Sequence, residues 1–244
     1  MIDIVRSIWI WVATASLVIG WVPLLCLIRL TDRDPLRLRT ARWFRQLGRL
    51  ISRVNPWRLH IAGVSHIEPN RPYVIVSNHQ SLADIPLLTH IRIDAKWLAK
   101  VELFQLPVVG WMLKMAGDIP VFRNNRRKAA HSLLQAARCL KQGCSLIFFP
   151  EGTRSPDGSV LPFNDGPFQI AIREKVQVLP LAVEGSGSAL PRSSWIFSGT
   201  QDIHLRVLAP VPVTEWTVKQ SGELRERVRQ MIIDEVARMR SQHN

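Results

Sequence analysis

The stretch "PYVIVSNHQSLADIP", residues 72–86, constrains the fold of this chain more than any other. Its first half is a continuous apolar run, which is typical of a strand that is buried on both faces of a sheet. The run stops at Ser77, Asn78 and His79, and Asp84 follows five residues after the histidine. An imidazole and a carboxylate at the end of a buried strand predict a functional site there.

The rest of the chain repeats this alternation of strand and helix. Short β-branched or aromatic runs recur at 95–99, 119–123, 145–150, 176–185 and 202–211. Helix-like stretches lie at 82–91, 107–116, 125–143, 164–175 and 221–242. The pattern predicts an α/β fold with a largely parallel or mixed central sheet flanked by helices. Ligands of such sheets bind beyond the carboxyl ends of the strands, so the polar residues that follow the strands are the candidate site.

The first segment of the chain is apolar enough to enter a membrane. Residues 7–28 contain no charge, and these 22 residues at about 1.5 Å rise would cross a hydrocarbon core of roughly 30 Å. Gly20 and Pro23 allow a bend, so a spanning helix and a re-entrant helix pair both stay open. We expect residues 1–31 to form a membrane-embedded anchor; the alternative is a buried core helix.

The chain is strongly basic, with 32 Lys and Arg against 19 Asp and Glu and a formal net charge of +13. Such a field favours nucleic acid, an anionic membrane or a phosphorylated substrate. Residues 32–58 read as a basic amphipathic helix on anionic lipid, or else as an ordinary packed helix. The arginine excess predicts that residues 59–244, the α/β domain, lie on the cytoplasmic face of the inner membrane. No basic groove with interleaved aromatic residues is evident, so we expect no nucleic-acid partner.

His79 and Asp84 have the chemistry of a base and its orienting group. The unperturbed pKa of histidine lies near neutral pH, and a carboxylate five residues on can hold one ring nitrogen and stabilise the imidazolium. Asn78 can donate a hydrogen bond or brace the turn. The alternative is a loop histidine with satisfied hydrogen bonds beside an aspartate that caps a helix.

The segment "FPEGTRS", residues 149–155, suits an anionic ligand. Gly152 lets the backbone approach the ligand, Thr153 offers a hydroxyl and an amide, and Arg154 can bind a phosphate through two hydrogen bonds. Glu151 can bond a substrate hydroxyl or hold a neighbouring arginine. The alternative is that the segment forms a tight turn with an internal ion pair, which would have the same sequence.

Four segments jointly resemble the motifs of the glycerolipid acyltransferases, whose best-known members act on lysophosphatidic acid (1-acyl-sn-glycerol-3-phosphate). The segments are "NHQSLAD" (78–84), similar to the NHx4D motif, "GDIPVFR" (117–123), "FPEGTRS" (149–155) and "VLPLAVEG" (178–185). The resemblance covers roughly residues 59–210. It implies transfer of a fatty acyl group from a thioester to the sn-2 hydroxyl of lysophosphatidic acid, which gives phosphatidic acid.

The resemblance also implies roles for individual residues. His79 would take the proton from the acceptor hydroxyl, Asp84 would orient it, and no covalent acyl-enzyme is expected. The acceptor site would be shaped by Arg123, Glu151, Gly152 and Arg154, with Asn78 and Thr153 beside them. Lys100 would be a further phosphate-binding cation. The donor would be acyl-CoA or acyl carrier protein, which are substrates, and no cofactor or metal is expected.

Two departures from the motifs leave other acceptors open. Pro120 and Phe122 make the second motif atypical, and Asn164 and Asp165 stand where similar sequences often carry a lysine. A different lysophospholipid or a lyso-aminolipid therefore stays an alternative acceptor.

Three rival functions have weaker support. A lipid hydrolase or thioesterase would need a nucleophile or a water, and no G-x-S-x-G motif is present. A non-enzymatic binder of anionic lipid or nucleic acid would use the arginine-rich helix, and the apolar anchor argues against nucleic acid. A metal site would need more ligands than one histidine and one aspartate, and the three cysteines, Cys26, Cys139 and Cys144, have no metal-ligand spacing to a histidine.

Overall fold

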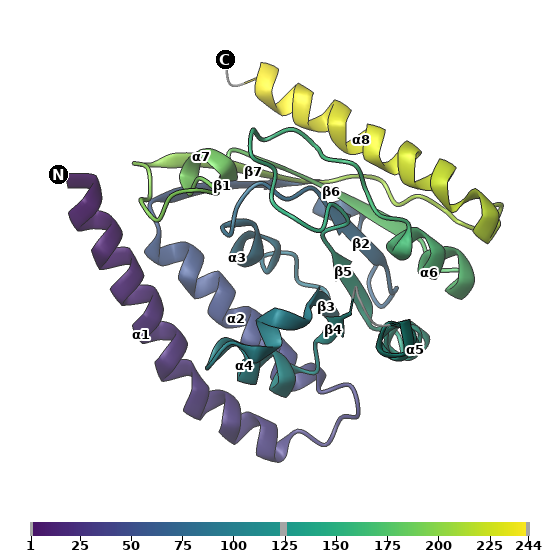
Figure 1. The fold of residues 1–244 in the computed structure, drawn as a ribbon, viewed down its shortest axis with the longest axis horizontal. Coiled ribbons are helices and arrows are strands. Elements are labelled where there is room, and N and C mark those ends of the chain that lie inside the picture. Colours follow the sequence, from purple (N-terminus) through teal and green to yellow (C-terminus); the bar gives the residue numbers. More distant parts are fainter. Residues whose placement is uncertain (1, 123–125, 243–244) are drawn as a thin grey trace.

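The computed structural model describes residues 2–122 and 126–242, and a mixed seven-stranded sheet forms its centre (Figure 1). The strands are β1 (Trp57–Ala62), β2 (Val74–Ser77), β3 (Ala95–Lys100), β4 (Ile119–Val121), β5 (Ser145–Phe148), β6 (Val178–Glu184) and β7 (Gln201–Val207). Their order in the sheet is β1-β7-β6-β2-β5-β3-β4. Neighbouring strands are parallel except β6 and β7. The predicted α/β class is confirmed, whereas β1 was not predicted.

Helices cover both faces of the sheet and enclose two apolar cores (Figure 1). Helices α5 (Arg126–Lys141), α6 (Gly166–Glu174) and α8 (Ser221–Ser241) cover one face, and α3 (Asp84–Leu88) covers the other. Within the segment that ends in β2, Val74 and Val76 enter the first core, and Tyr73 and Ile75 enter the second. Successive side chains of a strand point to opposite faces, so this segment is apolar throughout.

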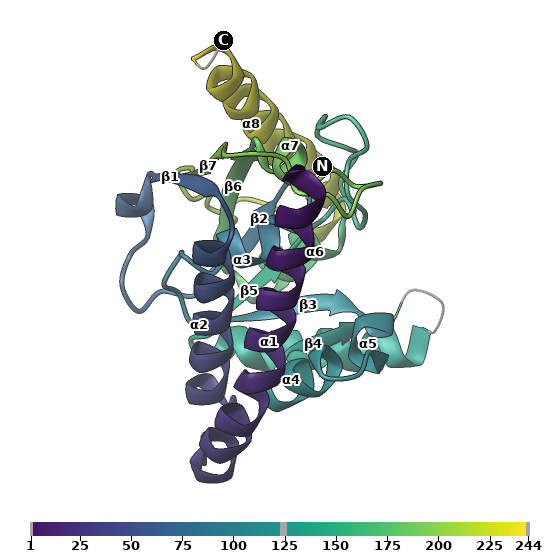
Figure 2. The same cartoon turned by 90° about the vertical axis from the view of Figure 1, so that its left-hand side faces the viewer.

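Helices α1 (Ile2–Thr31), α2 (Leu38–Val54) and α4 (Val109–Ala116) form a further layer outside α3 (Figures 1 and 2). Helix α1 is continuous through Pro23, so the bend that would have made residues 1–31 a helix pair does not occur. Instead α1 and α2 run antiparallel, and the Trp21 indole donates to the carbonyl of Trp43 at 3.1 Å. Among the described helices, α1 is the one that is long and apolar enough to cross a membrane.

Helix α2 uses several of its arginines within the protein. Arg42 donates two hydrogen bonds to Asp94, at 2.7 and 2.5 Å, and Arg45 pairs with the buried Asp118. Arg49 donates to the backbone carbonyl of Thr89, directly after α3, at 2.7 Å. The helix packs against α1, α3, α4 and β3, as the packed-helix alternative requires. Arginines that are paired in this way have fewer free donors for lipid.

The remaining short elements complete the chain. They are the 3-10 helices η1 (Val64–His66), η2 (Val101–Gln105) and η3 (Val218–Gln220) and the four-residue helix α7 (Ser186–Ala189). Helix α7 begins directly after the last strand-end motif, "VLPLAVEG". Gly185 precedes α7 with a φ of 85°, and a Cβ there would lie 2.3 Å from the carbonyl oxygen of Asp202. The close approach of β7 therefore requires glycine at this turn.

Candidate active site

His79 lies two residues beyond the end of β2, where the chain turns into α3. Its Nδ1 is 2.7 Å from Oδ2 of Asp84, the first residue of that helix. A carboxylate accepts hydrogen bonds, so Nδ1 carries the proton and Nε2 is left with a lone pair. This arrangement has the geometry of an oriented general base.

Asp84 is held rigidly, because one of its oxygens accepts three hydrogen bonds. Besides the imidazole, Oδ2 accepts from the backbone N–H groups of Gln80 at 2.8 Å and Ser81 at 2.9 Å. The carboxylate is fully buried, and the His79 side chain is 12% exposed. The turn between β2 and α3 therefore fixes the imidazole and leaves a small part of it accessible.

An aromatic ring fixes the plane of the imidazole. The ring of Phe149 stacks on His79 with centroids 4.0 Å apart and an interplanar angle of 15°. Phe149 in turn packs against Trp97 at 5.6 Å. Phe149 was not assigned a role from the sequence, although it is the first residue of "FPEGTRS". One face of the base is thus shielded from water.

Glu151 bonds the backbone of the base and points away from solvent. Its Oε1 accepts the N–H of His79 at 2.9 Å, whereas Oε2 is buried and has no hydrogen-bond partner among the described residues. Burial raises the pKa of Glu151 to about 8, despite the lowering effect of the hydrogen bond from His79. The carboxyl group is therefore mainly neutral near pH 7 and serves as a hydrogen-bond acceptor beneath the turn that carries His79.

Glu151→Gln is expected to retain most of the activity, and Glu151→Ala is expected to lose it. Glutamine reproduces the neutral side chain and its acceptor oxygen, whereas alanine leaves the N–H of His79 unsatisfied, at a cost of about 1–3 kcal/mol. The folded pKa lies above the unfolded one, so the wild type loses stability as the pH rises from about 4.5 to about 8. Thermal unfolding between pH 4.5 and 8.5 should show this loss, and it should be smaller in Glu151→Gln. An equal slope in both proteins would contradict the neutral carboxyl group.

The loop that follows Glu151 joins the turn that carries the base. The N–H of Ser155 donates to the carbonyl of His79 at 2.8 Å. Gly152 has a φ of 69°, and Thr153 is exposed. The Arg154 side chain has no hydrogen bond or ion pair to another described residue, so its guanidinium group is available to a ligand. The base and a free cation are thus presented by two loops that are bonded together.

Two polar residues near the base have structural partners. The side-chain amide of Asn78 donates to the carbonyl of Val183 and accepts from its N–H, both at 2.8 Å, and so extends the pairing of β2 with β6. The Ser81 hydroxyl donates to the carbonyl of Leu190 at 2.7 Å. No serine or cysteine side chain among the described residues is bonded to the imidazole of His79. An attack by a serine nucleophile therefore has no geometric support.

The other proposed cations are not gathered at the base. Lys100 is exposed at the end of β3. In the sheet, β5 separates β3 from β2, the strand that leads to His79. Arg123 lies outside the described residues. No cluster of three or more potential metal ligands occurs within the described ranges. Of the predicted site residues, the structure brings together His79, Asp84, Glu151, Gly152 and Arg154, with Asn78 and Thr153 beside them.

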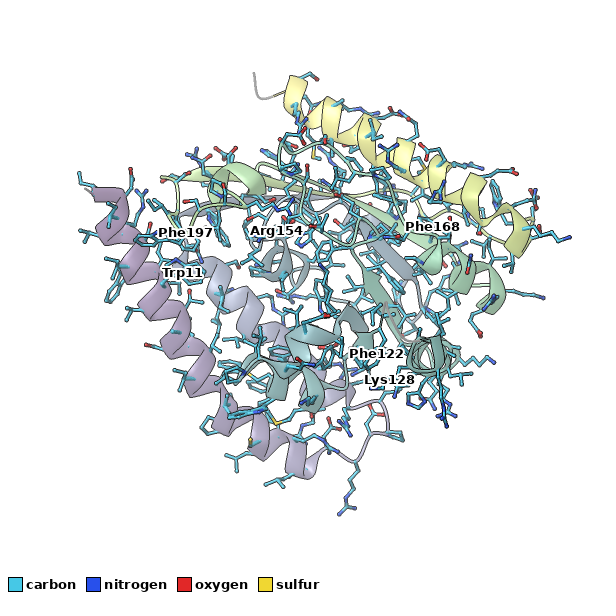
Figure 3. The ribbon with its side chains drawn as sticks, in the orientation of Figure 1. Trp11, Phe122, Lys128, Arg154, Phe168 and Phe197 are labelled. Atoms are coloured by element: carbon cyan, nitrogen blue, oxygen red, sulfur yellow. The ribbon has the colours of Figure 1, made fainter. Side chains whose placement is uncertain are left out.

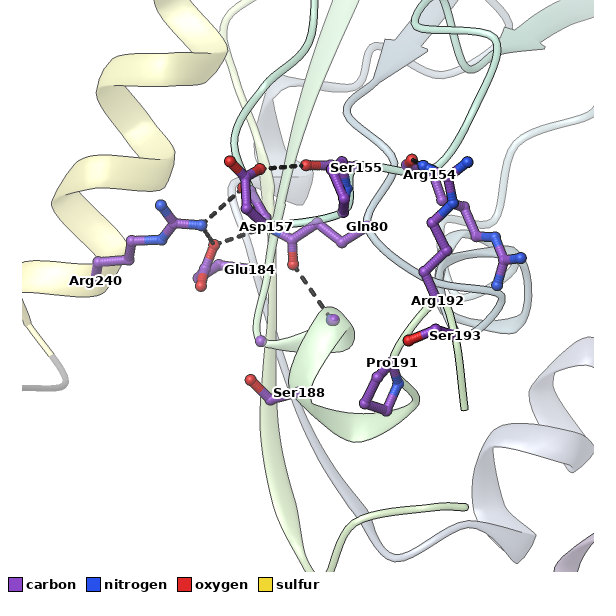
Figure 4. A pocket seen from close by; sticks show the side chains of 14 residues that line it. Gln80, Arg154, Ser155, Asp157, Glu184, Ser188, Pro191, Arg192, Ser193 and Arg240 are labelled. Atoms are coloured by element: carbon purple, nitrogen blue, oxygen red, sulfur yellow. Dashed lines mark hydrogen bonds and ion pairs between the residues drawn. The ribbon is translucent and has the colours of Figure 1, made fainter. Parts of the chain in front are cut away.

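A cleft of about 700 Å³ opens beside the turn of the base (Figure 4). Its lining includes Gln80, Arg154, Glu184, Arg192 and Arg240. Four of these, Gln80, Glu184, Arg192 and Arg240, were not assigned a role from the sequence. Gln80 and Glu184 lie within the first and fourth motif-like segments, whereas Arg192 and Arg240 belong to a loop and a helix that no motif connects with His79.

Comparisons with known proteins identify the family of this chain. The family model described as Acyltransferase matches residues 58–184. A chloroplastic 1-acyl-sn-glycerol-3-phosphate acyltransferase of Arabidopsis thaliana is 35% identical over 66% of this chain and 46% of its own length. The human 1-acyl-sn-glycerol-3-phosphate acyltransferase alpha is 32% identical over 72% of this chain and 62% of its own length. The chain thus spans about half the length of the curated relatives it matches.

A solved structure extends the likeness over nearly the whole chain. The crystal structure of the 1-acyl-sn-glycerophosphate acyltransferase PlsC from Thermotoga maritima superposes with a TM-score of 0.82 and 25% sequence identity. The match covers 98% of this chain and 96% of the other, so it includes helices α1 and α2 as well as the sheet.

Proposed function

The chain belongs to the acyltransferase family, and we propose that it transfers a fatty acyl group from an acyl thioester to the sn-2 hydroxyl of lysophosphatidic acid. The product would be phosphatidic acid, a step of phospholipid biosynthesis. The observation that carries the proposal is the pairing of His79 Nδ1 with Asp84 at 2.7 Å beside Arg154, whose guanidinium group has no ion pair with a described residue. The names of the curated relatives and of the structural neighbour support the same acceptor.

The chemistry follows from the protonation state of the imidazole. Nε2 of His79 takes the proton from the acceptor hydroxyl as its oxygen attacks the thioester carbonyl, and Asp84 stabilises the imidazolium that forms. The tetrahedral intermediate then breaks its C–S bond. The imidazolium returns the proton to the leaving thiolate, so the new ester, the free thiol and the neutral histidine result. No acyl-enzyme is formed.

The donor would be an acyl-CoA or an acyl carrier protein, both of which are anionic. A second cleft, of about 1290 Å³, lies between α4 and α5 and suits such a ligand. Its aromatic residues include Phe122, and the Lys128 ammonium lies 5.4 Å from that ring (Figure 3). The cations of the lining are Arg37, Lys96, Lys114, Arg127, Lys128 and Arg138. Opposite charge would concentrate an anionic donor beside the sheet.

The protein would act at a membrane surface, held there by α1. Large apolar side chains of this helix face solvent, among them Ile8, Trp9 and Ile19, which are 51, 68 and 63% exposed. A soluble surface rarely leaves such a stripe uncovered. The helix also packs along the domain: Trp11 lies beside Phe197 at one end (Figure 3). At the other end Cys26 lies beside Met115. This packing favours a helix that lies in one leaflet over one that leaves the domain and spans the bilayer.

Ile8→Gln/Ile19→Gln is expected to release the protein from lipid vesicles without unfolding it. Each substitution removes an exposed apolar side chain whose burial in hydrocarbon contributes roughly 1.5–3 kcal/mol. Leu133→Gln/Leu134→Gln, on the exposed face of α5, is the matched control, because those side chains are 41 and 59% exposed. Vesicle flotation measures binding. Equal flotation of both double variants would exclude α1 as the lipid-binding surface.

The proposed reaction is tested with purified protein and labelled donors. Acyl-CoA and acyl carrier protein are each offered with lysophosphatidic acid and with zwitterionic and neutral lysolipids. Labelled phosphatidic acid is the expected product. A labelled ester of another lysolipid would retain the reaction and reject the acceptor, and free fatty acid without a new ester would favour a hydrolase. No transfer by folded protein would reject the proposal.

A further inference from the structure

Two arginines occupy one end of the cleft beside the base. Arg154 comes from the loop after β5, and Arg192 comes from the loop after α7 (Figure 4). One guanidinium nitrogen of Arg192 donates to the backbone carbonyl of Arg154 at 2.7 Å. A guanidinium group has five N–H donors, so Arg192 keeps further donors for a ligand.

The acidic side chains of the cleft do not neutralise these arginines. Glu184 pairs with Arg240 at 3.0 Å and accepts from Gln80 at 2.9 Å. Asp157 accepts hydrogen bonds from Ser155 and Ser159. Figure 4 draws Arg240, Glu184 and Asp157 together, away from Arg154 and Arg192. Neither arginine of that end has an ion pair with a described residue, and two adjacent cations without a counter-charge indicate an anionic ligand.

The loop that carries Arg192 is attached to the proposed membrane helix. The Trp11 indole of α1 donates to the carbonyl of Trp195 at 2.8 Å, and the Ser7 hydroxyl accepts the N–H of Phe197 at 2.9 Å. Trp195 is 50% exposed, which suits a side chain at a lipid interface. The loop would therefore hold Arg192 at the depth where lipid headgroups lie.

We propose that Arg192 is a second cation for the phosphate of the lysophospholipid acceptor and, with Arg154, selects phosphate-bearing acceptors over uncharged ones. The inference rests on the proposed function and assigns a residue that lies outside all four motifs. The phosphate bridges the two guanidinium groups through charge-assisted hydrogen bonds, while the acceptor hydroxyl approaches Nε2 of His79.

This assignment accounts for the missing lysine. Asp165, at the position where similar sequences often carry that residue, pairs with Arg225 at 2.9 Å, and the Asn164 amide donates to the carbonyl of Pro150 at 2.6 Å. Neither side chain lines the cleft. The charge of Asp165 is thus neutralised by Arg225 outside the cleft. In place of the lysine, Arg192 supplies a cation to the cleft from a different loop.

The kinetic test compares lysophosphatidic acid with the matching monoacylglycerol, which lacks the phosphate. Arg192→Ala is expected to raise the KM for lysophosphatidic acid by about tenfold or more, with little change for monoacylglycerol. Arg192→Lys should recover part of the loss, because it keeps the charge without the planar fork. Arg173→Ala, at an exposed arginine of α6, changes the net charge equally and should leave both KM values unaltered.

A binding test separates this inference from the proposed reaction. Titration calorimetry measures the affinity of His79→Ala protein, with and without Arg192→Ala, for both lipids in detergent micelles. Preferential binding of lysophosphatidic acid that is lost on replacing Arg192 supports the inference even if no transfer is found. Equal affinity with and without Arg192 overturns it, whatever the wild type catalyses.

Discussion

Replacing His79 with alanine is expected to lower the rate of acyl transfer by about 10²- to 10⁴-fold, the range that a positioned general base contributes. The substitution removes Nε2, the proposed acceptor of the hydroxyl proton, so the attacking oxygen would have to lose its proton to water. Asp84 keeps its two backbone donors, from Gln80 and Ser81, so the turn should still form.

The comparison needs a control that separates chemistry from folding. His60→Ala serves this purpose, because His60 lies on the edge strand β1 and pairs with Asp202 on the surface. Initial rates with labelled donor are measured for both variants and the wild type, with circular dichroism to establish folding. A folded His79→Ala protein with wild-type kcat would exclude the imidazole as the base.

Replacing Asp84 with asparagine is expected to have the second-largest effect, a loss of about 10²-fold or more. Asparagine has nearly the same volume and keeps an acceptor for the backbone N–H groups, but it carries no charge to stabilise the imidazolium. In the opposite orientation the amide NH2 would face Nδ1, which would move the ring proton to Nε2 and block the base, but the N–H groups of Gln80 and Ser81 would then lose their acceptor. The variant should therefore fold and bind lipid while kcat falls.

The double variant distinguishes a working pair from two independent residues. If Asp84 acts through His79, His79→Ala/Asp84→Asn should be about as slow as His79→Ala alone. If the rate reductions of the two single variants instead multiply in the double variant, Asp84 contributes to catalysis separately. The orienting role would then be wrong. Thermal unfolding of all three proteins shows whether a loss of stability explains any difference.

Much of the fold and the centre of the site could be predicted because they depend on local sequence. The apolar run before Ser77 indicated a doubly buried strand, and β2 has all four residues buried. The spacing of His79 and Asp84 permitted their contact, because the residues of one turn lie close whatever the rest of the chain does. The alternation of strands and helices predicted that helices bury both faces of the sheet, and this prediction is confirmed as well.

Contacts between distant segments were not predictable in this way. No local pattern marks β1 as a partner of β7, 144 residues away at Arg58 and Asp202. The arginines of α2 suggested lipid, but Arg42 and Arg45 meet carboxylates that come from the β3 and β4 region. Charge periodicity shows that a helix has a basic face and says nothing about what the fold brings against it.

The sequence by itself determined the fold class, the apolar first helix and the pairing of His79 with Asp84. Only the tertiary structure decided that Glu151 is buried under the N–H of His79 and that Arg192 reaches the loop of Arg154. The physical reason is the distance along the chain over which each kind of interaction acts. Backbone pattern and hydrogen bonds within one turn act over a few residues, whereas the burial of a carboxyl group and the pairing of loops depend on which surfaces the packed sheet brings together.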